Sequence, residues 1–279
     1  MTQVDLLKKY GLSVRGRLGQ HILIDANTCR KIVGALELQP GDRVLEIGPG
    51  LGALTGEILD SGCHLAAVEK DPQFARVLEQ ELKPKFGKQF ELFCADFLEF
   101  DFAEQCGKTQ GTWKVISNLP YYVTAPILFR LFDQHVFFSK AILMMQKEVA
   151  KRLTANPGTK DYGRLTVGCQ YFSRMRHVMD VSPSCFTPKP QVDSSVVELT
   201  FKPAAERLSK SDEERLFKLV RTAFSQRRKT LFHLLSRDEE LCKTREIAAQ
   251  AFEKLGLEPK IRGEALNLEQ FIALSRQLG

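Results

Sequence analysis

The chain has 279 residues, of which 43% are hydrophobic and 27% are charged, and its formal net charge at pH 7 is +6. This composition is ordinary for a soluble globular protein with one large domain and a smaller one. No apolar stretch has the length of a membrane span, the N-terminal residues lack the apolar core of a signal peptide, and the seven cysteines form no C-x-x-C pair. We therefore expect a soluble cytoplasmic protein without disulfides or a metal site, and the positive charge suggests a polyanionic partner.

Between residues 43 and 150, short apolar runs alternate with helical patterns. The runs are RVLEI (43–47), HLAAVEK (64–70), FELFCAD (90–96), WKVISN (113–118) and KAILMMQKE (140–148). Alternation of strands and helices predicts an α/β fold with a mainly parallel sheet and helices on both faces.

The segment RLTVGCQYF (164–172) has apolar side chains at every second position, which predicts a strand. Its position directly after a helix leaves a helical assignment open. Two further runs, residues 174–181 and 194–201, are typical of strands and flank a proline-rich loop.

The pattern becomes helical from Ser211, which forms a capping-box pattern with Glu214. We place a domain boundary at about residue 205. Residues 1–205, which include a basic N-terminal segment, are predicted to form the cofactor-binding catalytic domain, and residues 206–279 a small helical domain that contacts RNA.

A glycine-rich loop, EIGPGLGALT (46–55), follows the first strand and opens a helix, a setting in which the backbone can approach a bound nucleotide. Gly48, Gly50 and Ala53 match the G-x-G-x-x-A pattern of dinucleotide sites, so NAD is one candidate. Glu46, however, puts a negative charge where a pyrophosphate would lie, and the loop holds no basic residue. S-adenosylmethionine, which lacks phosphate and carries positive charge, fits better.

Carboxylates end the next two strands. Glu69 can accept hydrogen bonds from both ribose hydroxyls, and Asp96 can accept one from an adenine amino group. Carboxylates at strand ends can also merely cap helices. Because ligands of open α/β sheets bind at the carboxyl ends of the strands, we favour the ligand site.

The fourth strand ends in SNLPYY (117–122). An adenine amino group is a poor nucleophile because its lone pair is delocalised into the ring. The side-chain oxygen of Asn118 and the carbonyl of Leu119 or Pro120 would accept its two N–H groups and draw the nitrogen towards a tetrahedral form that can attack a sulfonium methyl group. Pro120 fixes the local backbone, and Tyr121 offers a ring face to the base. Such a site works mainly by positioning.

An ordered set of motifs between about residues 16 and 235 resembles the ribosomal RNA adenine N6,N6-dimethyltransferases, and most closely the bacterial members that act on the small subunit. The motifs are GQHILID, EIGPGLGALT, VEKDP, ISNLPYYVTAPILF, MMQKEVAKRL, YGRL, FTPKPQVDSSVV and FSQRRKTL. The resemblance implies a Rossmann-like class I S-adenosylmethionine-dependent methyltransferase sheet with a small all-α C-terminal domain. It also implies that residues 162–172 are helical.

The implied activity is dimethylation of N6 on two adjacent adenosines in a hairpin near the 3′ end of 16S rRNA. We expect a monomer that binds the small ribosomal subunit or its precursor, without a metal, and that takes part in subunit biogenesis.

The resemblance also assigns site residues. It carries cofactor contacts to His21, Leu23, Gly48, Glu69, Asp96 and Asn118. His21 replaces the asparagine that the family usually has, in GQNFL, and imidazole can still donate a hydrogen bond. Phe186 would be a second stacking face opposite Tyr121, and Arg227, Arg228 and Lys229 would contact RNA phosphates.

Three other functions are compatible with parts of this pattern. The 23S rRNA dimethyltransferases that confer macrolide resistance are close relatives, but FTPKPQVDSSVV together with QRRKTL favours the 16S enzyme. DNA adenine methyltransferases share an Asn-x-Pro-aromatic tetrad, but they usually have Asp or Asn followed by Pro-Pro and a separate target-recognition domain. A ribosome-assembly factor whose binding matters more than catalysis would not need the intact tetrad at Asn118.

Overall fold

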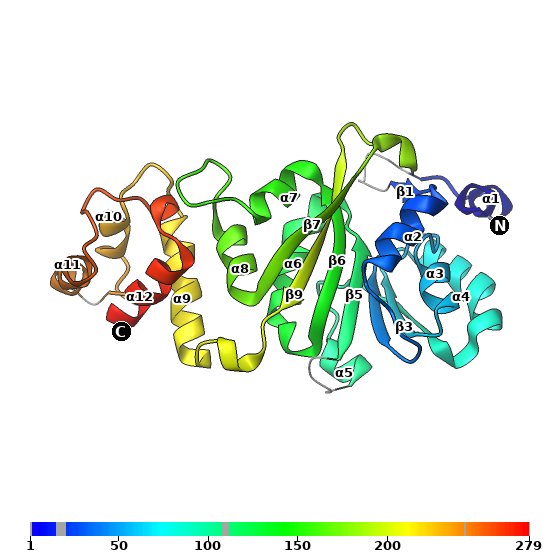
Figure 1. The fold of residues 1–279 in the computed structure, drawn as a ribbon, viewed down its shortest axis with the longest axis horizontal. Helices are drawn as coiled ribbons and strands as arrows, with labels where there is room; N and C mark the ends of the chain where they lie inside the picture. Colours follow the sequence, from blue (N-terminus) through cyan, green and yellow to red (C-terminus); the bar gives the residue numbers. More distant parts are fainter. Residues whose placement is uncertain (1, 15–20, 108–111, 243, 279) are drawn as a thin grey trace. The chain divides into compact units, whose positions relative to one another are not determined.

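The computed structural model describes residues 2–14, 21–107, 112–242 and 244–278. The chain forms two compact units (Figure 1). The sheet unit comprises residues 1–150 and 174–201, and the helical unit comprises residues 151–173 and 202–279. Residues 151–173 thus group with the helical unit, whereas the sequence-based boundary at residue 205 assigned them to the catalytic domain.

The described part of the sheet unit contains a seven-stranded sheet with the order β4-β3-β2-β5-β6-β9-β7. The pairs from β4 to β6 are parallel, and β9 runs antiparallel to β6. The strands are β2 (Arg43–Ile47), β3 (His64–Glu69), β4 (Phe90–Cys94), β5 (Trp113–Asn118), β6 (Phe138–Gln146), β7 (Ser173–Val181) and β9 (Ser194–Phe201). The strands predicted between residues 43 and 148 and over residues 174–181 and 194–201 are therefore confirmed, as is the Rossmann-like α/β class.

The strand order creates a switch point between β2 and β5. From β2 the chain builds outwards through β3 to β4, and it then returns to add β5 and β6 on the other side. In open α/β sheets, ligands bind at the carboxyl ends of the strands next to such a point. Ile47 ends β2 and Asn118 ends β5, so the topology brings the glycine loop and the SNLPYY stretch to one edge.

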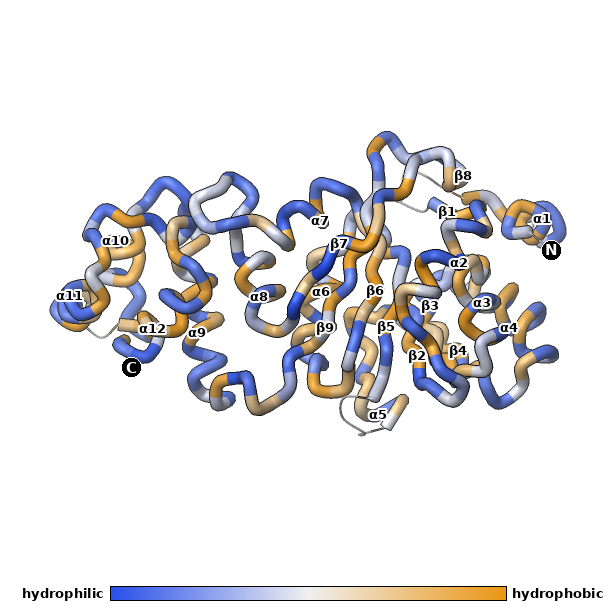
Figure 2. Tube along the Cα trace, viewed as in Figure 1, coloured by the Kyte–Doolittle hydropathy of each residue, from blue (hydrophilic) through white to orange (hydrophobic). Residues whose placement is uncertain are grey.

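Both faces of the central sheet are covered, because every residue of β2 and β3 after the first is buried. One hydrophobic cluster joins these strands to α2 (Ala26–Gly34) and α3 (Thr55–Asp60). Figure 2 shows hydrophobic residues concentrated along the strands. The other helices of this unit are α1 (Gln3–Lys9), α4 (Pro72–Phe86), α5 (Phe102–Cys106) and α6 (Thr124–Asp133), and α7 (Lys147–Leu153) crosses its boundary. None of the described helices is long and apolar enough to cross a membrane.

The helical unit contains α8 (Arg164–Phe172), α9 (Lys210–Ala223), α10 (Leu231–Leu235), α11 (Arg245–Lys254) and α12 (Leu268–Gln277). The strand predicted over residues 164–172 was wrong, and the helix implied by the resemblance is confirmed. Seven of the nine residues of α8 are buried, so its apolar residues do not mark a single helical face. The predicted capping box was also wrong, because the N-cap of α9 lies two residues earlier, at Ser209, which accepts a hydrogen bond from the Asp212 N–H.

Candidate active site

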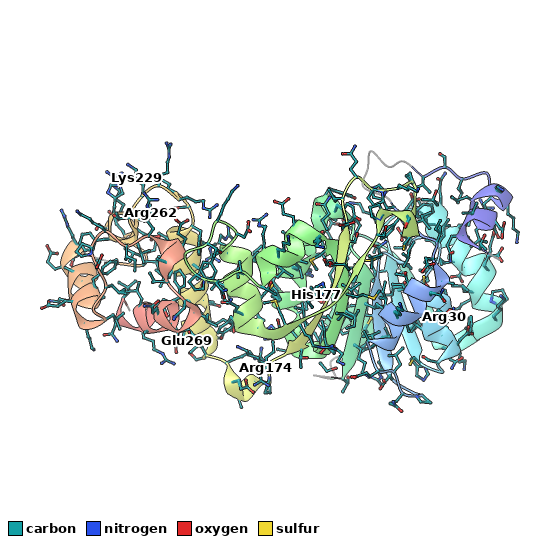
Figure 3. All side chains as sticks on the ribbon, turned by 45° about the horizontal axis from the view of Figure 1, so that its top comes forward. Arg30, Arg174, His177, Lys229, Arg262 and Glu269 are labelled. Atoms are coloured by element: carbon teal, nitrogen blue, oxygen red, sulfur yellow. The ribbon has the colours of Figure 1, made fainter. Side chains whose placement is uncertain are left out.

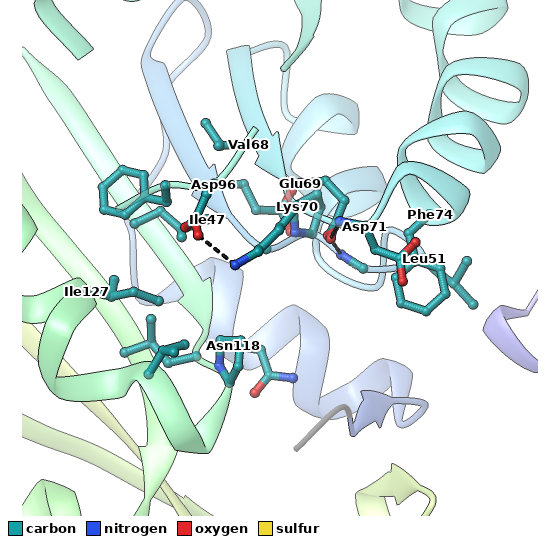
Figure 4. Close-up of a pocket in the computed structure, with 18 of the residues that line it drawn as sticks. Ile47, Leu51, Val68, Glu69, Lys70, Asp71, Phe74, Asp96, Asn118 and Ile127 are labelled. Atoms are coloured by element: carbon teal, nitrogen blue, oxygen red, sulfur yellow. Dashed lines mark hydrogen bonds and ion pairs between the residues drawn. The ribbon is translucent and has the colours of Figure 1, made fainter. Parts of the chain in front are cut away.

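A cavity of about 420 Å³ opens at the carboxyl ends of β2, β3, β4 and β5 (Figure 4). Its apolar walls include Ile47 and Val68, and its polar groups come from successive strand ends. The cavity brings together most of the residues predicted from sequence: His21, Leu23, Gly48, Glu69, Asp96, Asn118, Leu119, Pro120 and Tyr121. The described residues of the GQHILID motif begin at His21, because Gln20 and Gly19 lie outside them.

The loop after β2 contains three glycines, and all of them have a positive φ angle. Gly48 and Gly50 have φ angles of 65° and 60°, in the left-handed region that other residues rarely adopt. The Gly48 N–H donates to the Val68 carbonyl at 2.9 Å, and the Gly50 N–H donates to Oε2 of Glu69 at the same distance. These bonds hold the loop against the end of β3, so backbone and carboxylate form one wall of the cavity.

Glu69 is 6% exposed at the end of β3. Its Oε1 accepts a hydrogen bond from the Asp71 N–H at 2.8 Å, opposite the bond from Gly50. Burial raises the pKa of this carboxyl, and the bonds from the Asp71 and Gly50 N–H groups partly offset the increase. Each carboxylate oxygen has a further lone pair, so Glu69 can still accept hydrogen bonds from ribose hydroxyls.

Glu46 lies beneath the glycine loop and is 2% exposed. Its Oε2 accepts a hydrogen bond from the Thr55 hydroxyl at 2.7 Å. Burial raises the pKa of Glu46 to about 8, and the nearby charge of Glu69 acts in the same direction. Glu46 is therefore largely protonated at neutral pH. The sequence argument against a bound pyrophosphate relied on a negative charge at Glu46, and protonation reduces this charge.

Asp96, which the sequence assigned to the adenine amino group, follows β4 and lines the cavity. Its Oδ1 accepts a hydrogen bond from the Leu98 N–H at 3.0 Å, and its Oδ2 lies 2.6 Å from Nζ of Lys70 (Figure 4). Burial raises the pKa of Asp96, but the hydrogen bonds from Lys70 and Leu98 outweigh it and leave the pKa below its ordinary value. Asp96 is thus an ionised acceptor at neutral pH.

Lys70 is a pocket residue that the sequence argument did not single out, although it lies inside the VEKDP motif. It is the residue directly after Glu69. The sequence feature that could have identified Lys70 is the alternation of charge in that motif, in which a cation stands between two carboxylates at the end of β3. Neither Thr55 nor Ser194, the partner of Tyr121, had a signal in the sequence, because each acts through a contact that only the fold creates.

Asn118 ends β5, and its side-chain Nδ2 donates a hydrogen bond to the main-chain carbonyl of His21 at 3.2 Å. This bond fixes the amide orientation, because only the nitrogen can donate. The Oδ1 atom then accepts no hydrogen bond from any described residue. Asn118 therefore presents a free acceptor at the cavity, as the proposed chemistry of an amino group requires.

The structure also distinguishes the two carbonyls that the sequence left open. The Pro120 carbonyl accepts hydrogen bonds from the Val123 N–H at 3.1 Å and from the Thr124 hydroxyl at 3.2 Å. Within the described residues, the Leu119 carbonyl accepts none, while the Leu119 N–H donates to the Met144 carbonyl at 2.9 Å. Of the two carbonyls, that of Leu119 is therefore the one left open to a further donor, and that of Pro120 closes the turn.

Tyr121 lies at the mouth of the cavity with its hydroxyl 2.7 Å from the Ser194 hydroxyl at the start of β9. Its ring centroid is 5.4 Å from that of His21, with the planes tilted by 33°. The Nδ1 atom of His21 lies 2.7 Å from the Pro188 carbonyl. His21 thus contacts Asn118 through its backbone and Tyr121 through its ring.

Phe186 does not line the cavity. It is 2% exposed and belongs to the hydrophobic core, because β8 (Phe186–Thr187) pairs with β1 (Ile22–Leu23) and aligns Phe186 with Leu23. A ring in this position offers no face to a base. The stacking role predicted for Phe186 stays a prediction that its core position does not support.

The basic triplet lies in the helical unit, in the turn between α9 and α10. Arg228 and Lys229 are exposed and have no partner among the described residues. Arg227 differs, because its Nη2 donates to the Lys160 carbonyl at 2.6 Å and forms an ion pair with Glu264 at 3.4 Å. Arg227 therefore has a structural task within the unit. The basic residues Arg15 and Arg17 of the N-terminal segment lie outside the described residues.

Among the described residues, no group of three or more His, Cys, Asp or Glu side chains could hold a metal ion. The cavity does fit S-adenosylmethionine. The carboxylates of Glu69 and Asp96 suit its hydroxyl and amino donors, the apolar walls suit a purine, and the glycines allow close backbone approach.

Comparison with known proteins is consistent with this geometry. The model of the ribosomal RNA adenine dimethylase family matches residues 11–276. A ribosomal RNA small subunit methyltransferase A from Halothermothrix orenii is 40% identical over 98% of this chain and 91% of that protein. The protein of the same name from Lactobacillus acidophilus is 40% identical over 98% of this chain and 94% of its own length.

Two solved structures have the same fold. A dimethyladenosine transferase from Plasmodium falciparum has a TM-score of 0.76 and 28% identity, covering 91% of this chain and 96% of that one. The 23S rRNA methyltransferase ErmE has a TM-score of 0.66 and 27% identity, covering 92% of this chain and 99% of that one. The chain therefore belongs to the ribosomal RNA adenine dimethylase family and is an S-adenosylmethionine-dependent methyltransferase.

Proposed function

We propose that this protein dimethylates N6 of two adjacent adenosines in a hairpin near the 3′ end of 16S rRNA, within the small ribosomal subunit or its precursor. The observation that carries the proposal is the pair of open acceptors at the end of β5, Oδ1 of Asn118 and the carbonyl of Leu119, beside a cavity that suits a nucleoside cofactor. Similarity over nearly the whole chain to small-subunit methyltransferases supports the choice of substrate. We place the enzyme in the cytoplasm, as a monomer that acts during subunit biogenesis.

In the proposed reaction, S-adenosylmethionine supplies an electrophilic methyl group. Asn118 and Leu119 accept the two N–H groups of the adenine amino nitrogen, which localises its lone pair. The new N6–C bond forms as the sulfur–methyl bond breaks, and the N6 proton passes to solvent. No side chain needs to act as a strong base, so most of the rate enhancement comes from positioning and from acceptors fixed in advance.

The remaining pocket residues hold the reactants. Glu69 binds the ribose hydroxyls and Asp96 the adenine amino group of the cofactor, while Gly48 and Leu23 shape the wall on which it lies. Tyr121 provides the ring on which the target adenine stacks. His21 keeps Asn118 in its orientation through the bond to its carbonyl.

Contact with RNA is assigned to the helical unit, through Arg228 and Lys229, with Arg227 supporting the turn that carries them. Phosphate contacts position an RNA but do not specify its sequence. These residues therefore contribute to docking rather than to the choice of adenine.

The test is mass spectrometry of 16S rRNA from cells with and without this protein. Loss of two adjacent dimethyladenosines near the 3′ end, restored by the wild-type gene and not by Asn118→Ala, is the expected result. Isolated small and large subunits serve as alternative substrates in vitro. Methylation of the large subunit alone would support the 23S reading and overturn the proposal.

A further inference from the structure

A second cavity is lined only by residues of the helical unit. It has a volume of about 490 Å³ and is bordered by the last turn of α9 and by α10 with the segment that follows it. Its lining includes the side chains of Arg221, His233 and Arg237, and two acidic residues, Asp238 and Glu240. The reaction at the first cavity uses none of these residues.

The acidic groups of this cavity are already satisfied. Asp238 accepts a hydrogen bond from the Thr222 hydroxyl at 2.7 Å and another from the Leu241 N–H at 3.2 Å. Glu240 forms an ion pair with Lys218 on α9. Lys218 thus offsets the charge of Glu240, whereas Asp238 keeps its negative charge beside the arginines because its donors are neutral.

The basic groups have no such partners. Arg221 and Arg237 are exposed, and neither guanidinium makes a hydrogen bond or ion pair with any residue that the structure describes. The ring of His233 also has no hydrogen-bond partner in the described part of the chain. The positive charge of Arg237, followed by desolvation and the charge of Lys229, holds the pKa of His233 below its ordinary value. With Glu240 offset by Lys218, the charge of Asp238 balances only one of the two arginines, so the cavity keeps a net positive charge.

Two helix ends favour positive charge at this cavity. Arg221 is in the last turn of α9 and His233 in the last turn of α10, where the helix dipole favours positive charge. Arg237 lies beyond the end of α10, so the dipole of that helix does not stabilise its charge within the last turn. Figure 3 shows that Lys229 extends from the surface of the same unit.

We propose that this cavity, lined by Arg221, His233 and Arg237, is a binding site for a backbone phosphate of ribosomal RNA. Two unpaired guanidiniums suit a phosphate, because each can donate two parallel N–H bonds to its oxygens. The site adjoins the Arg227–Lys229 turn, since Gln226 also lines the cavity, but its arginines are other residues than Arg227, which is engaged by Lys160 and Glu264. The inference rests on the proposed function for its choice of RNA as the anion.

The experiment compares the wild type with the double variant Arg221→Gln/Arg237→Gln. Binding to protein-free 16S rRNA, protein-free 23S rRNA and intact small subunits is measured over a salt series. The expected result is a loss of affinity of about 10- to 100-fold at low salt and a salt-dependence slope smaller by about 0.7–0.9, since that is the contribution of one lost phosphate contact. Turnover at saturating RNA and the binding of S-adenosylmethionine stay unchanged.

A matched control removes the same charge elsewhere on the helical unit. Lys254→Gln/Arg276→Gln changes two exposed cations on α11 and α12, and it should alter the slope much less. Arg221→Lys/Arg237→Lys keeps both charges and should restore the slope but only part of the affinity. Thermal unfolding checks that all variants are folded.

Equal slopes for the double variant and its control would overturn the site. Loss of affinity for intact subunits but not for free rRNA would also overturn it, because the cavity would then hold an acidic protein segment. The proposed function fails separately, if the enzyme methylates only 23S rRNA while the cavity variants still lose affinity for RNA. A wild type that binds no rRNA would overturn both.

Discussion

The Nζ atom of Lys70 lies 2.6 Å from Oδ2 of Asp96, so the carboxylate expected to receive an adenine amino group already holds a donor. Lys70 therefore competes with that amino group for the carboxylate. Because its side chain is 68% exposed, the ion pair is weak and readily exchanged.

We predict that Lys70→Met binds S-adenosylmethionine about 2- to 5-fold more tightly, since an exposed ion pair of this strength no longer competes. Asp96→Ala should weaken binding by about 10-fold or more, because a charged acceptor is lost. Isothermal titration calorimetry measures both, with the exposed Lys88→Met as a control. Equal weakening by Lys70→Met and Asp96→Ala would show instead that Lys70 contacts the cofactor.

Glu46 predicts a pH-dependent stability. Its pKa is about 8 in the folded state and near 4.5 when unfolded, so the folded state binds the extra proton. Below about pH 4.5 the group costs nothing, and its cost grows as the pH rises and is complete above about pH 8. Glu46→Gln, which stays neutral, should therefore be more stable than the wild type by about 2–4 kcal/mol at pH 7, with a difference that shrinks towards pH 4.5. Unfolding in denaturant at pH 5, 7 and 8.5 measures this difference, and a gap independent of pH would refute the assignment.

Asn118→Ala should separate chemistry from binding. The variant loses one acceptor for the adenine amino group, so single-turnover methyl transfer is expected to fall by about 10²-fold or more. Cofactor affinity, measured by calorimetry, should stay within a few-fold of the wild type. Near-normal transfer would exclude Oδ1 of Asn118 as an acceptor in the transition state.

Phe186 tests whether a core residue also serves the substrate. Phe186→Ala should destabilise the sheet unit by about 3–5 kcal/mol, as for other large buried rings. Phe186→Leu keeps much of the volume, so it should fold and retain most of the turnover. A stable Phe186→Leu variant with more than about 10-fold lower turnover would instead support base stacking, which is worth about 1–3 kcal/mol.

Gly263 marks a close approach between the residues before α12 and the end of α9. A Cβ at this position would lie 2.7 Å from the Ala223 carbonyl oxygen and 2.8 Å from its Cβ. Gly263→Ala should therefore destabilise the helical unit by about 1–3 kcal/mol, in the range of overpacked cores. Gly34→Ala is the control, because nothing lies within 4 Å of its added Cβ and helical alanine is favoured. Equal unfolding midpoints for the two variants would mean that the loop moves away at no cost.

The sheet could be predicted from sequence because its strands are short apolar runs separated by helices, and the strand ends then locate the site. Residues 164–172 misled the period-two argument because they are buried on nearly all sides, where periodicity carries no information. Ser209 and Ser211 can each cap a helix with acidic residues in its first turn. The backbone geometry selects Ser209, so α9 begins earlier than predicted.

The sequence predicted the cavity residues that belong to a motif or end a strand. It did not predict the positions that depend on contacts between distant parts of the chain. Lys70 is engaged because the fold brings it to Asp96, 26 positions along the chain. The core position of Phe186 follows from the pairing of β8 with β1, two segments far apart in sequence. Long-range pairing of this kind leaves no local pattern.

Residues 151–173 and 202–279 form one compact unit although residues 174–201 return to the sheet between them. The ring of Phe172 on α8 stacks on that of Phe217 on α9 at 5.2 Å and 3°, and Tyr171 donates a hydrogen bond to Glu213. A fragment that begins at residue 206 would lack α8 and expose this aromatic face to water. The helical unit therefore cannot be isolated as a single C-terminal fragment. Grafting it onto another protein requires both pieces of chain, and a clean exchange between relatives has to be made at residues 150–151, 173–174 and 201–202 together.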